Sequence, residues 1–203
     1  HDALPICCRS FLQGWKDENG VEVNSGRMNL GVVTVNLPRI ALESEGDMNK
    51  FWEIFNERMN IAEDALVYRV ERTKEATPAN APILYQYGAF GHRLGKEESV
   101  DQLFKNRRAT VSLGYIGLYE VATVFFGNSW EHNPDAKEFT LDIIRDMKRR
   151  VEEWSDQYGY HFSIYSTPSE SLTDRFCRLD TEKFGSIPDI TDKEYYTNSF
   201  HYD

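Results

Sequence analysis

One run of residues constrains the fold of this chain more than any other feature. Residues 30–37 are mostly apolar and β-branched, and Pro38 follows them directly. A short run of this kind is typical of a buried strand. Because proline has no N–H to donate to a sheet, the strand should end here. We therefore expect a fold built around a buried sheet.

Two long segments have apolar residues at three- and four-residue steps, a spacing typical of amphipathic helices. The first covers residues 47–75 and ends before two prolines, and its aromatic stripe should be part of the core. The second begins at Asn133 and Pro134, a cap followed by a first-turn proline, and should stop at Gly159. Both helices are predicted to be scaffold.

Shorter segments alternate with these helices along the chain. Gly114 and Gly117 predict either a close approach to the backbone or a bulge or tight turn. Strands alternating with helices predict an α/β fold with a parallel sheet covered by helices. The shorter segments are expected strands at 83–87, 109–116, 160–165 and 195–200, and expected helices at 99–106, 118–126 and 167–182.

Composition limits the classes of function. The chain has 203 residues, enough for one packed domain, and its net charge of -10 argues against a nucleic-acid partner. Three cysteines, an odd number, indicate a reducing compartment, and neither a membrane-spanning run nor a signal-like start is evident. We expect a cytoplasmic protein without membrane or metal sites in these residues. The start at His1, without Met, predicts a fragment or a processed chain.

The adjacent thiols Cys7 and Cys8 stand beside a cation, Arg9. Three readings stay open from the residues alone. The thiols are buried small hydrophobes, or one is a low-pKa nucleophile, or the pair forms a strained vicinal disulfide. The third cysteine, Cys177, falls on or beside the apolar side of a predicted helix and is expected to be structural.

A Ser/Thr-rich turn joins the strand predicted at 160–165 to the next helix. Thr167 and Glu170 have capping-box spacing, and Pro168 suits a first helical turn, which would make this an ordinary capped helix. The same arrangement offers backbone amides and a positive helix end to a phosphate group. Both interpretations fit the residues.

Several long motifs, in order, closely resemble the anaerobic (class III) ribonucleoside-triphosphate reductases, which are glycyl-radical enzymes. The resemblance covers nearly the whole chain. It implies a ten-stranded α/β barrel, of which this chain would form roughly the second half. Residues 1–28 would be the finger loop that carries the thiol, and residues 29–203 the half-barrel. The motifs are Cys8-Arg-Ser-Phe-Leu and the segments 26–42, 108–120, 160–176 and 195–203.

The resemblance also implies roles for individual residues. Cys8 matches the thiyl-radical cysteine, which abstracts the 3′ hydrogen of the ribose, and Asn29 matches an asparagine that hydrogen-bonds the substrate sugar. Asparagine suits this role because it offers a donor and an acceptor without charge. The matching loop at the substrate phosphates comprises Ser166, Thr167, Pro168, Ser169, Glu170 and Ser171.

The implied activity is the anaerobic reduction of ribonucleoside triphosphates to deoxyribonucleoside triphosphates. It would need a glycyl radical and structural zinc from elsewhere in a longer enzyme, a radical-SAM activating enzyme and a homodimer. Formate is the expected reductant, but Ile6-Cys7 stands where the formate-using branch has Met-Gly, so a thiol route through Cys7 stays open. The chain alone is expected to be inactive. The alternatives are a non-catalytic nucleotide-binding module derived from the same barrel and, more weakly, a vicinal-dithiol redox protein.

Overall fold

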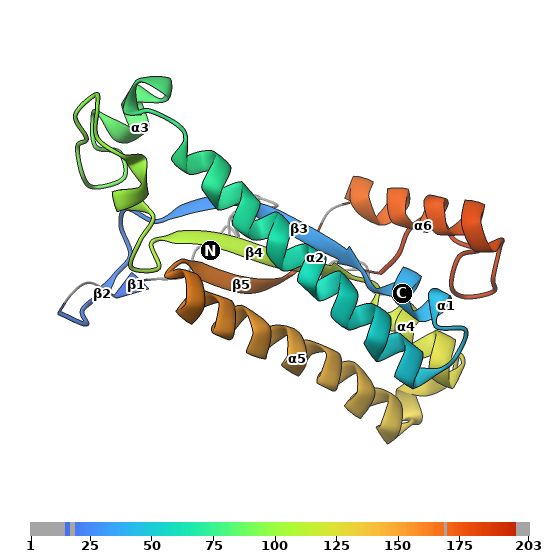
Figure 1. Cartoon of the computed structure of the whole chain (residues 1–203). Coiled ribbons are helices and arrows are strands. Elements are labelled where there is room, and N and C mark those ends of the chain that lie inside the picture. Colours follow the sequence, from blue (N-terminus) through green and yellow to red (C-terminus); the bar gives the residue numbers. More distant parts are fainter. Residues whose placement is uncertain (1–14, 17–18, 169, 198–203) are drawn as a thin grey trace, which may run out of the picture.

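The computed structural model describes residues 15–16, 19–168 and 170–197. Its centre is a parallel sheet of three strands with the order β3-β4-β5 (Figure 1). The strands are β1 (Trp15–Lys16), β2 (Glu22–Val23), β3 (Met28–Asn36), β4 (Ala109–Ile116) and β5 (His161–Ser166). The α-helices are α1 (Leu37–Glu43), α2 (Met48–Lys74), α3 (Pro82–Tyr85), α4 (Leu118–Phe126), α5 (Pro134–Tyr158) and α6 (Glu170–Phe184), and the 3-10 helices are η1 (Pro78–Asn80), η2 (Val100–Leu103) and η3 (Trp130–His132).

The two faces of this sheet differ in composition. Leu113 of β4 and Phe162 of β5 point to one face, where α2 packs on β3 and α5 on β5 (Figure 1). We call this the outer face. The opposite face, which we call the inner face, carries Ser112 and Ser163, whose hydroxyl oxygens are 2.9 Å apart. Helix α6 covers part of it, since Leu172 lines a cavity together with Thr34.

The long helices have the boundaries that their sequence predicts. Asp47 caps α2 by accepting a hydrogen bond from the amide of Asn49 at 2.8 Å. Asn133 caps α5 in the same way, and Gly159 ends it with a φ of 77°. The predicted stripe of α2 is buried, which confirms that its aromatic residues belong to the core. It comprises Phe51, Phe55, Met59, Ala62, Leu66 and Val70.

The strand predicted at residues 30–37 ends one residue earlier than expected. Asn36 is the N-cap of α1, a short helix absent from the sequence prediction, and Pro38 occupies its first turn. Proline ends the strand as predicted, but it also starts a helix because its fixed φ suits the first turn. Gly117, with a φ of 83°, forms the tight turn between β4 and α4.

Two predicted strands are wrong or incomplete. Residues 83–87 were expected as a strand, but α3 occupies most of this range because Pro82 starts a helical turn. Residues 195–197 form no strand, and the rest of the strand predicted to 200 lies outside the described residues. The 99–106 helix is only the 3-10 helix η2 followed by turns. Conversely, β1 and β2 form a small antiparallel ladder in a part of the chain where no strand was predicted.

Candidate functional site

A cavity of about 560 Å³ opens along β3 and under α6. Asn29 and Thr167, which the sequence separates by more than a hundred residues, both line it. Arg69 of α2 and Tyr165 of β5 add a cation and a phenol to its wall. The remaining lining is largely apolar and comes from β3 and α6: Leu30, Gly31, Val32, Thr34, Leu172 and Phe176. The structure therefore brings two of the predicted site residues to one cavity.

A bulge in β3 fixes the position of Asn29. The register shifts between Asn29, which pairs with Thr110, and Gly31, which pairs with Val111, so Leu30 is the extra residue. The amide of Gly31 donates to Oδ1 of Asn29 at 2.7 Å. Gly31 has a φ of 127°, a conformation that side chains rarely allow. The strand itself therefore holds the Asn29 side chain, before any ligand is bound.

The side chains of Thr167 and Thr34 contact each other next to Gly114. The two hydroxyl oxygens are 3.0 Å apart. A Cβ placed on Gly114 would lie 2.6 Å from the Thr34 oxygen and would also collide with Thr167. Close approach to the backbone was one of the two readings of this glycine, the other being a bulge or tight turn, and the structure identifies the approaching group as a pair of threonines.

The predicted phosphate loop is only partly in place at this cavity. Ser166 ends β5, Pro168 is buried and Ser171 is exposed, and the cavity wall includes none of the three. Helix α6 begins at Glu170, three residues later than the capping pattern predicted, while the Thr167 hydroxyl pairs with Thr34. Ser169, Cys7 and Cys8 lie outside the described residues.

Rows of polar residues cross the inner face next to this cavity. Asn29 of β3 is paired with Thr110 of β4, and Thr110 is paired with His161 of β5. Ser112 and Ser163 form the next row. Burial and the nearby Arg107 lower the pKa of His161, so its ring is neutral near pH 7. The sequence gave no reason to single out His161 or Arg69, because the sheet register and the path of α2 bring them here.

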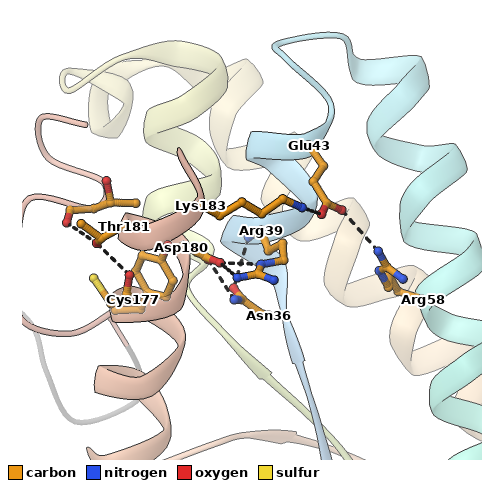
Figure 2. Close-up of polar contacts among 10 residues, drawn as sticks. Asn36, Arg39, Glu43, Arg58, Cys177, Asp180, Thr181 and Lys183 are labelled. Atoms are coloured by element: carbon orange, nitrogen blue, oxygen red, sulfur yellow. Dashed lines mark hydrogen bonds and ion pairs between the residues drawn. The ribbon is translucent and has the colours of Figure 1, made fainter. Parts of the chain in front are cut away.

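A separate cluster of buried carboxylates is accounted for by structural contacts. Both oxygens of Asp180 on α6 accept hydrogen bonds, from Asn36 at 2.9 Å, Arg39 at 2.5 Å and Tyr196 at 2.7 Å. Figure 2 shows Asn36 and Arg39 pointing toward Asp180, and Lys183 reaching Glu43. These contacts attach α6 to the end of β3 and to α1, so Asp180 is an anchor.

Glu120 of α4 anchors the segment that follows α6. It accepts hydrogen bonds from the amide and the hydroxyl of Thr197, at 2.9 and 2.7 Å, and pairs with Lys193 at 2.6 Å. Cys177 is buried beside this segment, and burial raises the pKa of its thiol to about 11. This thiol is therefore protonated at neutral pH, and its structural role, as predicted, agrees with its full burial.

Within the described residues, no group of three or more His, Cys, Asp or Glu side chains is arranged to hold a metal ion. No helix in that part of the chain is long and apolar enough to cross a membrane.

Comparison with known sequences identifies the relatives of the chain. The family model of the anaerobic ribonucleoside-triphosphate reductases matches residues 1–203. A reductase of this name from Salmonella typhimurium is 50% identical over 202 residues, which are 98% of this chain and 28% of that protein. The one from Enterobacteria phage T4 is 48% identical over 201 residues, 97% of this chain and 32% of the relative. The chain thus spans about a third or less of the relatives it matches.

Solved structures agree with this result. The anaerobic ribonucleotide reductase of Thermotoga maritima in complex with dATP and CTP is 26% identical, with a TM-score of 0.64. The likeness covers 85% of this chain and 29% of that one. A second anaerobic ribonucleotide reductase, 24% identical, matches 91% of this chain with a TM-score of 0.68 and supports the fold. The parallel sheet and its covering helices are a part of the barrel of these enzymes, and the chain belongs to the family of anaerobic ribonucleoside-triphosphate reductases.

Proposed function

We propose that the chain is part of the catalytic barrel of an enzyme that reduces ribonucleoside triphosphates to deoxyribonucleoside triphosphates. The observation that carries the proposal is the cavity of about 560 Å³ that Asn29 and Thr167 line together. A cavity of this size is in the usual range for small-molecule sites. Its wall combines apolar side chains with a few polar groups at fixed positions, as such sites do.

The substrate would lie along β3. Asn29 at one end would hydrogen-bond the ribose, and its side chain is already held by the amide of Gly31. The loop from Ser166 to Ser171 at the other end would hold the phosphates, since it leads into the 15-residue helix α6, whose N-terminus favours negative charge. The overall charge of -10 makes such local donors necessary, because no broad positive field attracts the phosphates.

Cys8 would carry the radical chemistry. Its thiyl radical would take the 3′ hydrogen of the ribose, and the reaction would end with C–H in place of C–OH at C2′. A glycyl radical elsewhere in the longer enzyme, generated by a radical-SAM activating enzyme, would supply the unpaired electron. Formate is the proposed reductant, with Cys7 as the alternative, and structural zinc would lie elsewhere in a homodimeric, cytoplasmic enzyme.

The test replaces cysteines in the full-length reductase that carries this segment. Cys8→Ser should abolish deoxynucleotide formation under anaerobic activation while leaving ribonucleotide binding by calorimetry unchanged. Cys177→Ser is the matched control, since this thiol is fully buried and does not line the cavity. Retained deoxynucleotide formation in Cys8→Ser would overturn the proposal. Nucleotide binding without any turnover in the wild-type protein would instead favour the non-catalytic module.

Cys7→Ser separates the two reductants. If formate is the reductant, this variant should keep its activity in the presence of formate. Loss of activity in Cys7→Ser, together with activity of the wild-type enzyme on a dithiol without formate, would assign the thiol route.

A further inference from the structure

Arg69 of α2 is the one charged side chain among the described residues that line the cavity. Neither Asp nor Glu is among these lining residues. The chain as a whole has a net charge of -10, so a positive charge in this wall is a local feature. A guanidinium group binds carboxylate and phosphate oxygens through paired N–H donors. The charge of the cavity wall therefore suits an anion.

Arg69 differs from the other basic residues of its helix in its partners. Each of the other four pairs with a carboxylate: Lys50 with Glu45, Arg58 with Glu43, Arg72 with Glu75 and Lys74 with Glu71. Within the part of the chain that the structure describes, the Arg69 guanidinium has neither an ion pair nor a hydrogen bond. Its donors are therefore available to a ligand in the cavity that it lines.

Gly31 of β3 gives the guanidinium its place in the wall. A Cβ on Gly31 would lie 2.5 Å from Nη1 of Arg69, closer than real side chains allow. The guanidinium thus lies against the backbone of the strand, in the space that a side chain would fill. The amide of the same glycine donates to Oδ1 of Asn29 at 2.7 Å. One glycine therefore positions a cation and an amide side chain at the same part of the cavity.

The sheet register shows which end of the cavity this cation serves. Gly31 is one paired position from Asn29 and three paired positions from Thr34. Three positions of a strand span about 10 Å. The Thr34 hydroxyl oxygen is 3.0 Å from that of Thr167, which marks the other end. An anion bound to Arg69 would therefore lie beside Asn29, at the end proposed for the ribose.

We propose that the guanidinium of Arg69 binds an oxyanion in the cavity, beside Asn29. This inference rests on the function proposed above and adds an anion-binding residue outside the predicted phosphate loop. Two anions of that reaction carry suitable oxygens, the carboxylate of formate and the triphosphate of the substrate. Formate fits a substrate whose phosphates lie at the Thr167 end, and a phosphate fits a substrate bound in the opposite direction.

The experiment compares wild type, Arg69→Gln and Arg69→Lys in the full-length reductase. Calorimetry measures the affinity for a ribonucleoside triphosphate and for the same ribonucleoside without phosphates, and anaerobic turnover measures the KM for formate. If Arg69 binds a phosphate, Arg69→Gln should weaken binding of the triphosphate roughly 10- to 100-fold and leave binding of the nucleoside unchanged. If it binds formate, both affinities should stay and the KM for formate should rise by a similar factor. Arg69→Lys keeps the charge but not the paired donors, so it should restore part of either loss.

Arg72→Gln is the matched control. Arg72 lies on the same helix, but it pairs with Glu75 and does not line the cavity, so this variant should behave as the wild type does. Unchanged triphosphate affinity together with an unchanged response to formate in Arg69→Gln would overturn the inference while the proposed function stands. An equal loss for the triphosphate and the nucleoside would also overturn it, because an ion pair with a phosphate is absent from the nucleoside complex. Failure of the wild-type enzyme to bind any ribonucleotide would overturn both.

Discussion

The two faces of the central sheet use the same strands for different purposes. On the outer face, Val111 and Leu113 have no exposed surface, and α2 packs on their strand. On the inner face, one residue away along the same strand, Thr110, Ser112 and Gly114 are small, and two of them are polar. The outer face gains its stability from apolar burial, while the inner face supplies the polar side chains of Asn29, Thr34 and Tyr165 to the cavity. Because side chains alternate along a strand, neighbouring residues of β4 serve different faces: one set stabilises the core and the other lies on the face with the cavity.

Truncation of the outer face should have the largest effect on stability. Leu113→Ala removes a fully buried side chain in the middle of β4 and should lower the free energy of unfolding by about 2–5 kcal/mol. Urea denaturation measures this loss. Leu141→Ala on α5 is the control, because Leu141 is 38% exposed and should lose much less. Equal losses for the two variants would mean that the outer face is not the stabilising one.

Adding a methyl group to the inner face should damage both stability and the site. Gly114→Ala brings a Cβ against the hydroxyls of Thr34 and Thr167, which should cost about 1–3 kcal/mol and weaken nucleotide binding. Thermal unfolding and calorimetry measure the two effects. In a Thr34→Ala/Thr167→Ala background both hydroxyls are gone and only Val32 Cγ1, at 3.0 Å, stays close, so the additional cost of Gly114→Ala should be much smaller. A full cost in that background would contradict the close approach.

Alkaline pH should loosen the helix that covers the inner face. Burial raises the pKa of Cys177 on α6 to about 11 from an ordinary 9.0. A raised folded-state pKa contributes stability that is present below pH 9 and is lost as the pH rises through 11. The loss should be on the order of 1–2 kcal/mol in urea denaturation across this window. Cys177→Ala should flatten the profile there, and an unchanged profile would exclude the thiol as its cause.

Tyr196, whose hydroxyl donates to Asp180, is a second group that titrates at alkaline pH. Burial, and then the neighbouring Asp180, raise the pKa of its hydroxyl far above 10. Its contribution is therefore present below pH 10 and is lost at higher pH. Tyr196→Phe should remove the part of the pH dependence that remains in Cys177→Ala above pH 10.

The serine pair should show a small effect on stability. Ser112→Ala or Ser163→Ala leaves the other hydroxyl buried without this partner, at a cost of about 1–2 kcal/mol each. The double variant removes both groups and should cost less than the sum of the two. A double-mutant cycle by urea denaturation gives the coupling. Additive losses would show that the 2.9 Å pair contributes nothing to stability.

Local signals predicted most of the scaffold. The strand Ala109–Ile116 has the predicted bounds, and α5 lies between its predicted cap and its predicted stop, because periodicity and capping are properties of neighbouring residues. The strand predicted at 83–87 is wrong because a short apolar run after a proline also fits a helical turn. The ladder of β1 and β2, two residues per strand, is too short to leave a pattern.

The site was less predictable, since its contacts are long-range. Asn29 and Thr167 could be singled out by resemblance, but that they line one cavity follows from the sheet order. Arg69 could not be found, because it stands in a segment with an ordinary helical pattern. Only its contact with Gly31 and its place in the cavity wall mark the arginine. The roles of Cys8 and of the phosphate loop stay predictions.

The bulge in β3 has a consequence for insertions and deletions. Met28 is buried in the core and Asn29 lines the cavity, and both keep these faces because Leu30 is the extra residue of the bulge. Removing Leu30 would restore regular pairing and leave both side chains where they are. Removing a residue between Val32 and Val35 would instead shift part of the strand by one position and turn the side chains of that part to the opposite face. In an alignment of this strand, a one-residue gap should therefore be tolerated at Leu30 and excluded farther along it.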